Sequence, residues 1–174
     1  MLFSSARLSF RAFSETDIGA FARLNADPDV MRYFPSVMTK EESRAAAKRI
    51  TGHFEKYGYG YYSVFEKATE EFIGLIGFGH PQFESWFTPC VEIGWRMNKA
   101  FHGKGYATEG ALACFGYGKK NFALSTVFSF TAVINKPSEN VMKRIGMEKE
   151  GGFDHPLIAE SSPLRRHVLY RINM

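Results

Sequence analysis

One stretch of the chain has the residue types and spacing that an anion-binding loop needs. Residues 102–108 read His-Gly-Lys-Gly-Tyr-Ala-Thr, and they follow a strand-like run at 92–97. A strand, a short glycine loop and a helix start leave several backbone N–H groups free at the positive end of the helix, where a phosphate binds. The sequence therefore predicts an anion site here, with an ordinary glycine turn as the alternative.

Two common phosphate loops do not match this stretch. A dinucleotide fingerprint needs a third glycine at position 108, which is Thr108. A P-loop needs Ser or Thr after Gly103-Lys104, and Gly105 stands there instead. The anion is therefore expected to belong to another class of phosphate-bearing ligand.

A second stretch, residues 135–147, adds Asn135 and Ser138 at the start of a helix. Pro137 suits the first helical position, and Gly146 suits the position after the last. The pattern predicts a strand at 91–98, a helix at about 105–120 and a strand at 125–134. Together these form a right-handed βαβ unit with parallel strands, and residues 135–147 follow its second strand.

The remaining patterns predict the elements that position these two stretches. Alternation and capping signals indicate strands at 7–13, 61–66, 72–78, 147–153 and 166–172, and helices from about 17 and at 40–56. Glycines at 74, 77 and 79 within one strand indicate bulges or a close backbone approach. The chain of 174 residues is read as one α+β domain, 1–174, with a mixed, mostly antiparallel sheet of six to seven strands flanked by helices.

Composition narrows the class of protein. The net charge of +4 is spread over scattered basic pairs, so no nucleic-acid partner is expected. Cys90 and Cys114 are the only cysteines, which favours reduced thiols and a cytoplasmic location. No secretory signal and no apolar run of membrane-spanning length is seen, so no membrane partner is expected. The histidines have no ligand spacing, so no metal is expected.

Together, the two stretches resemble the GNAT superfamily of N-acetyltransferases, in the branch like the ribosomal-protein N-terminal acetyltransferases. Residues 102–107 match the family's [RQ]-x-x-G-x-[GA] loop, except that His102 stands where Arg or Gln is usual. Asn135-x-x-Ser138 through Gly146-Met147, and the opening at residues 7–11, are typical of that branch. The resemblance covers essentially the whole chain, and implies a GNAT-like fold that uses acetyl-CoA.

The resemblance also implies roles in binding acetyl-CoA. The pyrophosphate would lie on a loop made of His102, Gly103, Lys104, Gly105, Tyr106, Ala107 and Thr108. A bulge in strand 92–97 would splay it from strand 125–134, and pantetheine would fill the gap against the backbone of Trp95, Arg96 and Met97. Asn135 would bond a pantetheine amide, and Asn140 and Lys143 would lie near the adenosine.

Catalysis needs a base for the amine and a donor for the leaving sulfur. Many relatives use a tyrosine as donor at the position held here by Met142, and in the branch resembled a serine serves instead, which Ser138 matches. Glu92 resembles a strand carboxylate of several relatives, and is expected to act directly or through a water. The structural alternatives are a helix-start role for Ser138 and an ordinary strand carboxylate for Glu92.

The sequence thus predicts transfer of acetyl from acetyl-CoA to a primary amine, by direct attack in a ternary complex. The acceptor is a protein N-terminus or a small-molecule amine, and acids at Asp27, Asp29, Asp154 and Glu160 leave a cationic acceptor open. A non-catalytic acyl-CoA-binding or sensing module is the alternative, and a homodimer is open because dimers are common in the branch.

Overall fold

The computed structural model describes all residues, 1–174, and is built on one sheet. Its strand order is β1-β2-β3-β4-β5-β6-β8-β7, and only the β5–β6 pair is parallel. The strands are β1 (Phe3–Ser4), β2 (Leu8–Arg11), β3 (Tyr61–Glu66), β4 (Phe72–Gly79), β5 (Glu92–Met97), β6 (Thr126–Ala132), β7 (Glu148–Asp154) and β8 (Arg166–Asn173).

The predicted count of six to seven strands is wrong, because the sheet has eight. The extra strand is β1, whose two residues are too few for an alternating pattern to appear in the sequence. It is held on β2 by packing: the Phe3 ring stacks on Phe10 at 4.4 Å and on Tyr117 at 4.2 Å.

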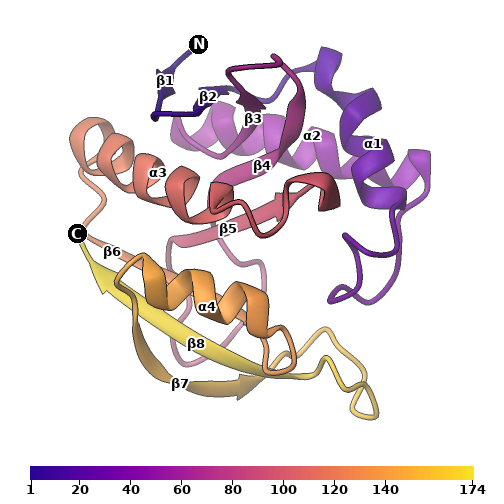
Figure 1. Ribbon diagram of the computed structural model, residues 1–174. Coiled ribbons are helices and arrows are strands. Elements are labelled where there is room, and N and C mark those ends of the chain that lie inside the picture. The colour runs from indigo at the N-terminus through magenta and orange to yellow at the C-terminus, as the bar shows by residue number, and fades with distance from the viewer.

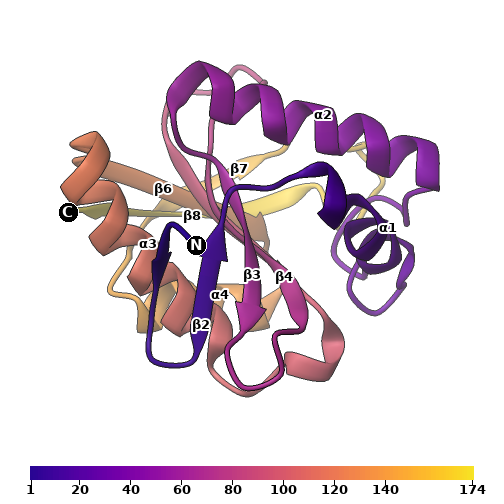
Figure 2. The same cartoon turned by 90° about the horizontal axis from the view of Figure 1, so that it is seen from above.

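Helices cover both faces of the sheet. They are η1 (Glu15–Asp17), α1 (Ile18–Ala26), α2 (Lys40–Tyr57), η2 (Lys99–Phe101), α3 (Tyr106–Phe122) and α4 (Lys136–Arg144). Figures 1 and 2 show α3 and α4 on one face and α1 and α2 on the other. None of these helices combines the length and the apolar composition that crossing a membrane requires.

Each face of the sheet has its own core. Leu8, Phe10, Tyr62, Ile76 and Phe78 are fully buried in the larger core, to which α3 contributes Ala111 and Cys114. The smaller core lies under α1 and α2, and contains Phe13, Phe21, Leu24, Ala47 and Leu75. β4 contributes to both cores, which is why its sequence is almost continuously apolar instead of alternating.

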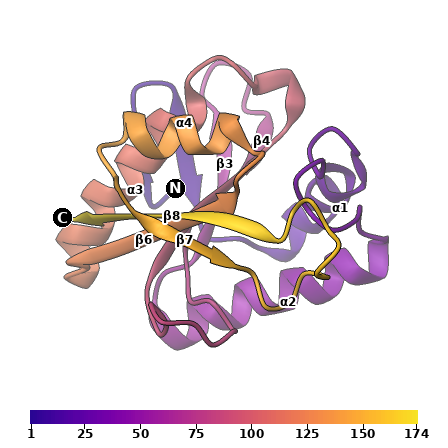
Figure 3. The same cartoon turned by 90° about the horizontal axis from the view of Figure 1, so that it is seen from below.

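The sheet opens between its two parallel strands. β5 and β6 share a single register pair, Glu92 with Phe128, and Ser129 Oγ donates to the Ile93 carbonyl at 2.9 Å just beyond it. Past that point the strands separate, and Figure 3 shows β6, β8 and β7 running together at a steep angle to β3 and β4. The expected splay is therefore present.

The bulge expected in strand 92–97 is absent. β5 keeps a continuous register with β4 from Glu92 to Met97, and β6 stays paired with β8 from Thr126 to Ala132. β5 therefore stays paired with β4, and β6 stays paired with β8. The sheet separates between β5 and β6 because these two strands share only one register pair. The register shifts elsewhere in the sheet: Ile73 is an extra residue on β4 opposite Val64 and Phe65, and Glu150 is an extra residue on β7 between Lys149 and Gly151.

Candidate active site

The glycine loop leads from η2 into α3. Gly103 and Gly105 have φ of 75° and 79°, a left-handed conformation that favours glycine, and Gly105 is the N-cap of α3. The first backbone bond of the helix is donated by Glu109 to Gly105, so the N–H groups of residues 106–108 have no partner within the helix. Residues 102–105 are exposed, and the strand–loop–helix geometry that an anion needs is therefore present.

Arg7 and Glu109 bind the loop to the start of the sheet. The Glu109 carboxylate accepts from Ser5 Oγ, from the Arg7 backbone N–H and from Arg7 Nε, each at 2.7 Å. Arg7 Nη1 donates to the Lys104 carbonyl at 3.0 Å. Burial acts to raise the pKa of Glu109, but the bonds from Ser5 and Arg7 outweigh it and hold that pKa below its usual range. Glu109 is thus a structural anion, and its place in the first turn of α3 puts its charge at the positive end of the helix.

Gly105→Val is expected to weaken acetyl-CoA binding about tenfold or more, because a side chain at φ 79° costs roughly 1–2 kcal/mol and displaces the helix start. Isothermal titration calorimetry measures this change. Gly116→Ala, at an exposed position of α3 with no atom near its added carbon, is the control and should leave the affinity unchanged. Equal affinities for folded Gly105→Val and wild type would contradict a role for the loop.

β5 presents backbone groups to the opening. Asn98 donates its N–H to the Ile73 carbonyl on β4 at 2.8 Å, so by alternation the peptide groups of Trp95 and Met97 turn toward β6. The Met97 carbonyl is within 2.9 Å of His102 Nε2, which leaves the Trp95 peptide facing the opening. The backbone N–H and carbonyl of Arg96, between these two residues, point toward β4 instead. This geometry therefore does not support the prediction that Arg96 binds pantetheine.

Ser138 lies at the start of α4, across the opening from β5. Trp95 Nε1 donates to Ser138 Oγ at 3.2 Å. Since an indole nitrogen only donates, Ser138 is the acceptor and its own hydroxyl proton stays available. Asn135 Oδ1 caps α4 by accepting from the Ser138 N–H at 3.3 Å, and Asn135 Nδ2 donates to Thr131 at 2.8 Å. Asn135 has one amide proton left for the predicted pantetheine bond.

The rest of α4 divides into buried and exposed parts. Met142 is buried in the core, so no donor stands at that position. Glu139 is buried and accepts from Tyr170 Oη at 3.0 Å, and both Lys136 at 2.8 Å and Lys143 at 3.6 Å pair with it. Asn140 and Lys143 are exposed on the helix, where an adenosine contact stays a prediction.

Glu92 projects from the other face of β5, toward α1 and α2. Tyr61 Oη donates to Glu92 Oε1 at 3.0 Å, and the Tyr61 ring packs with the core under those helices. Burial raises the pKa of Glu92 from 4.5 to about 7, against the opposing effect of the Tyr61 hydrogen bond. A carboxylate with this pKa exchanges a proton readily near neutral pH, as a general base must.

Comparison with known proteins identifies the family. The sequence model of the GNAT acetyltransferase domain matches residues 7–148. This chain belongs to the GNAT acetyltransferase family. An uncharacterized N-acetyltransferase, YnaD of Bacillus subtilis, is 34% identical over 155 residues, which are 88% of this chain and 86% of YnaD.

Solved structures agree with that assignment. A GNAT-family acetyltransferase from Bacillus anthracis is 30% identical, with a TM-score of 0.79 over 98% of this chain and 96% of its own. RimL, a ribosomal L7/L12 N-acetyltransferase solved with coenzyme A, is 18% identical, with a TM-score of 0.80 over 99% and 97%. At that identity RimL shows a shared fold. The protein is therefore an acetyl-CoA-dependent acyltransferase of the GNAT family.

The residues of this acetyltransferase fit acetyl-CoA. The exposed glycine loop offers free N–H groups to a pyrophosphate, and an atom added at Gly103 would meet nothing within 4 Å. The β5–β6 opening offers peptide groups to an amide-bearing arm. The structure contains no group of three or more His, Cys, Asp or Glu side chains able to hold a metal ion.

Sequence reasoning missed Tyr61 and the bond from Trp95 to Ser138. The glycines of β4 and β5 are the sequence feature that could have indicated Tyr61. A Cβ atom added at Gly79 would lie 3.0 Å from the Tyr61 ring, and one added at Gly94 would lie 2.9 Å from the Tyr61 hydroxyl. Tyr61 pairs with Gly77, and Gly77 pairs with Gly94, so the tyrosine lies over a row of glycines to reach Glu92. These glycines therefore make room for a side chain as well as for backbone.

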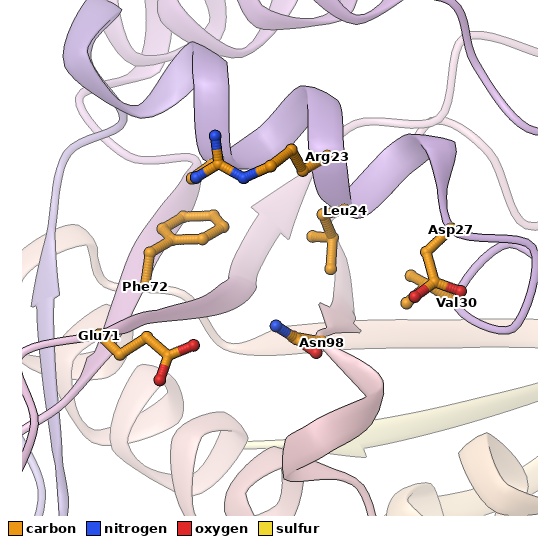
Figure 4. Close-up of a pocket in the computed structure, with 8 residues that line it drawn as sticks. Arg23, Leu24, Asp27, Val30, Glu71, Phe72 and Asn98 are labelled. Carbon is orange, nitrogen blue, oxygen red and sulfur yellow. The ribbon is translucent and has the colours of Figure 1, made fainter.

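Two other features, the aromatic loop before β5 and a hollow along α1, lie outside the candidate site. In the loop before β5, Phe87 is buried against Phe128, Phe130 and Phe153, while Trp86 is 63% exposed. A hollow of about 310 Å³ runs along α1, and Figure 4 shows Arg23, Asp27, Glu71 and Asn98 around it. That hollow includes neither Glu92 nor Ser138, the two residues predicted to be catalytic.

Proposed function

We propose that this acetyltransferase acetylates a primary amine that binds on the α1–α2 face of β5 and attacks the thioester directly. One observation carries the proposal: Glu92 and Trp95 project from opposite faces of the same short strand, where it parts from β6. A proton acceptor therefore lies on one side of the opening, and a hydroxyl donor, Ser138, lies on the other.

Acetyl-CoA, when bound, supplies the electrophilic carbonyl and the sulfur leaving group. Glu92 takes a proton from the incoming ammonium, directly or through a water, since the protonated amine is not a nucleophile. Ser138 donates its hydroxyl proton in a hydrogen bond toward the sulfur, with its oxygen held by Trp95. The N–H groups of residues 103–108 hold the pyrophosphate, and Asn135, Asn140 and Lys143 bind farther along the cofactor.

The cysteines favour direct attack over a covalent acetyl-enzyme. Burial, with a smaller effect of the Glu92 charge, raises the pKa of Cys90 to about 11, and burial alone raises the pKa of Cys114 still further. Neither thiol forms much thiolate near neutral pH, and the thiolate is the nucleophile. Initial-rate plots should therefore show intersecting lines, and parallel lines would contradict the ternary complex.

The acceptor is a protein N-terminus or a small-molecule amine. The fold shared with RimL supports the first, and both classes carry the primary amine from which Glu92 would take a proton. The test is a panel of amines and peptide N-termini with acetyl-CoA, read by release of free thiol. Turnover of at least one amine is expected. Thermal stabilisation by acetyl-CoA without thiol release across the panel would favour the sensing module instead.

A further inference from the structure

Arg96 is a half-buried cation without a counter-ion. It lies on the same face of β5 as Glu92, since both alternate with Ile93, Trp95 and Met97. Its side chain makes one hydrogen bond, from Nη1 to Asn25 Oδ1, and its guanidinium lies 4.2 Å from the centre of the Phe34 ring. No carboxylate lies within ion-pair distance of it.

The groups that hold Arg96 are neutral and fixed. Asn25 is fully buried, and its Nδ2 donates to Ser43 Oγ at 3.1 Å, so its oxygen is turned toward the guanidinium. Arginine has five N–H donors in a planar fork, and one of them is used here. Burial lowers the pKa of Arg96 to about 10, so it remains charged at neutral pH without an anion to balance it. Buried charges are usually paired, which indicates that a partner comes from outside the chain.

The acids that left a cationic acceptor open are already neutralised. Lys99 pairs with Asp27 at 3.8 Å and with Asp29 at 2.9 Å. Asp154 pairs with Arg166 at 3.2 Å, and Glu160 lies 3.9 Å from Arg165. The unbalanced charge near Glu92 is therefore positive, and the geometry argues against an acceptor that carries a second positive charge besides its ammonium group.

We propose that Arg96 binds a carboxylate carried by the acceptor amine, so that the preferred acceptor is an amine with an anionic group several atoms away. This inference rests on the proposed function, because it places the amine at Glu92. A single guanidinium balances one negative charge, which suits a carboxylate better than a doubly charged phosphate. The Tyr61 ring lies against Gly94, between the two charged groups.

The strand sets the length of the acceptor. Residues 92 and 96 are four positions apart on β5, so their Cα atoms are separated by roughly 13 Å at the usual rise. Because both side chains reach toward the acceptor, the amine and the carboxylate should be about 7–13 Å apart. An extended peptide covers that span with an acidic side chain at its second to fourth residue.

The experiment compares matched acceptors that differ in one charge. The pairs are Ala-Glu-amide with Ala-Gln-amide, Ala-Ala-Glu-amide with Ala-Ala-Gln-amide, and 6-aminohexanoate with 6-aminohexanamide. Wild-type enzyme is expected to prefer the anionic member of at least one pair by about tenfold or more in kcat/KM. Arg96→Gln should reduce that ratio to near one without changing the Kd for acetyl-CoA, and Arg96→Lys should retain part of it.

The outcomes separate this inference from the proposed function. Turnover by wild type with no preference in any pair overturns the role of Arg96 and leaves the acetyltransferase reaction intact, even if Arg96→Gln fails to fold. A preference that survives in folded Arg96→Gln also overturns it. If no amine is acetylated, the same pairs are compared by thermal shift of the CoA complex, where equal shifts overturn the carboxylate site and a larger anionic shift lost in Arg96→Gln supports it.

Discussion

Glu92→Gln is expected to lower kcat/KM for the amine by about a hundredfold to ten-thousandfold, the usual contribution of a general base. The substitution keeps the shape of the side chain and an oxygen that can accept from Tyr61, so the Kd for acetyl-CoA should not change. Steady-state kinetics with saturating acetyl-CoA measures the loss. A loss of less than about threefold would remove Glu92 from the mechanism, and a water chain without a carboxylate would then have to serve.

The pH profile of the wild-type enzyme gives an independent readout of Glu92. Its ionised form is the base, so kcat/KM should fall as pH drops through about 7. Tyr61, Cys90 and Arg96 are the other titratable groups near it, and the pKa of Tyr61 is raised well above its usual range, chiefly by burial and then by the Glu92 charge. Tyr61→Phe removes a bond that lowers the pKa of Glu92, so the acid limb should move to higher pH.

Glu92 should also make the free energy of unfolding depend on pH: the ionised form that serves as the base is the form that destabilises the fold. The folded pKa of Glu92, about 7, lies above the ordinary value of 4.5. As pH rises from 4.5 to 7, the unfolded chain therefore loses its proton first, and the folded state loses stability on the order of 1–3 kcal/mol. Glu92→Gln avoids that penalty, so it should raise the Tm at pH 8 and make little difference at pH 5. If Glu92→Gln changes the Tm equally at both pH values, burial does not raise the pKa of Glu92.

Ser138→Ala is expected to lower kcat about tenfold to a thousandfold, because it removes the hydroxyl placed to stabilise charge on the leaving sulfur. The Kd for acetyl-CoA should change much less, since the glycine loop and the β5 backbone still hold it. Asn135 caps α4 through the Ser138 backbone N–H, which alanine keeps, so the helix should remain intact. An unchanged kcat would assign Ser138 a structural role at the helix start.

Trp95→Phe tests whether the hydrogen bond from the indole to Ser138 matters for catalysis. It removes the indole N–H that holds Ser138 Oγ at 3.2 Å, but keeps most of the ring packed against the core. We expect a smaller loss of kcat than for Ser138→Ala. The double variant should be no worse than Ser138→Ala alone, because the indole acts through the hydroxyl. Additive losses would show that Trp95 contributes by another route, such as the predicted contact of its backbone region with the pantetheine arm.

Local patterns in the sequence were enough to predict the loop, the helix start and the strands at which acetyl-CoA is expected to bind. Glycines in a tight loop, a proline near a helix start and alternating strand residues each act within a few positions, so these elements can be read directly from the sequence. They predicted the loop at 102–108, the start of α4 and the parallel β5–β6 unit. The eighth strand escaped because β1 is two residues long and is held by distant aromatic rings.

Only the tertiary structure shows which neighbours hold the side chains predicted to act in catalysis and acceptor binding. Tyr61 and Glu92 are 31 residues apart, Trp95 and Ser138 are 43 apart, and Arg96 and Asn25 are 71 apart. Which of these side chains meet depends on strand register and on which face each one occupies, and no local pattern specifies either. Charge balance is likewise a property of neighbours: the acids that suggested a cationic acceptor proved to be paired, and Arg96 proved to be the charge without a partner.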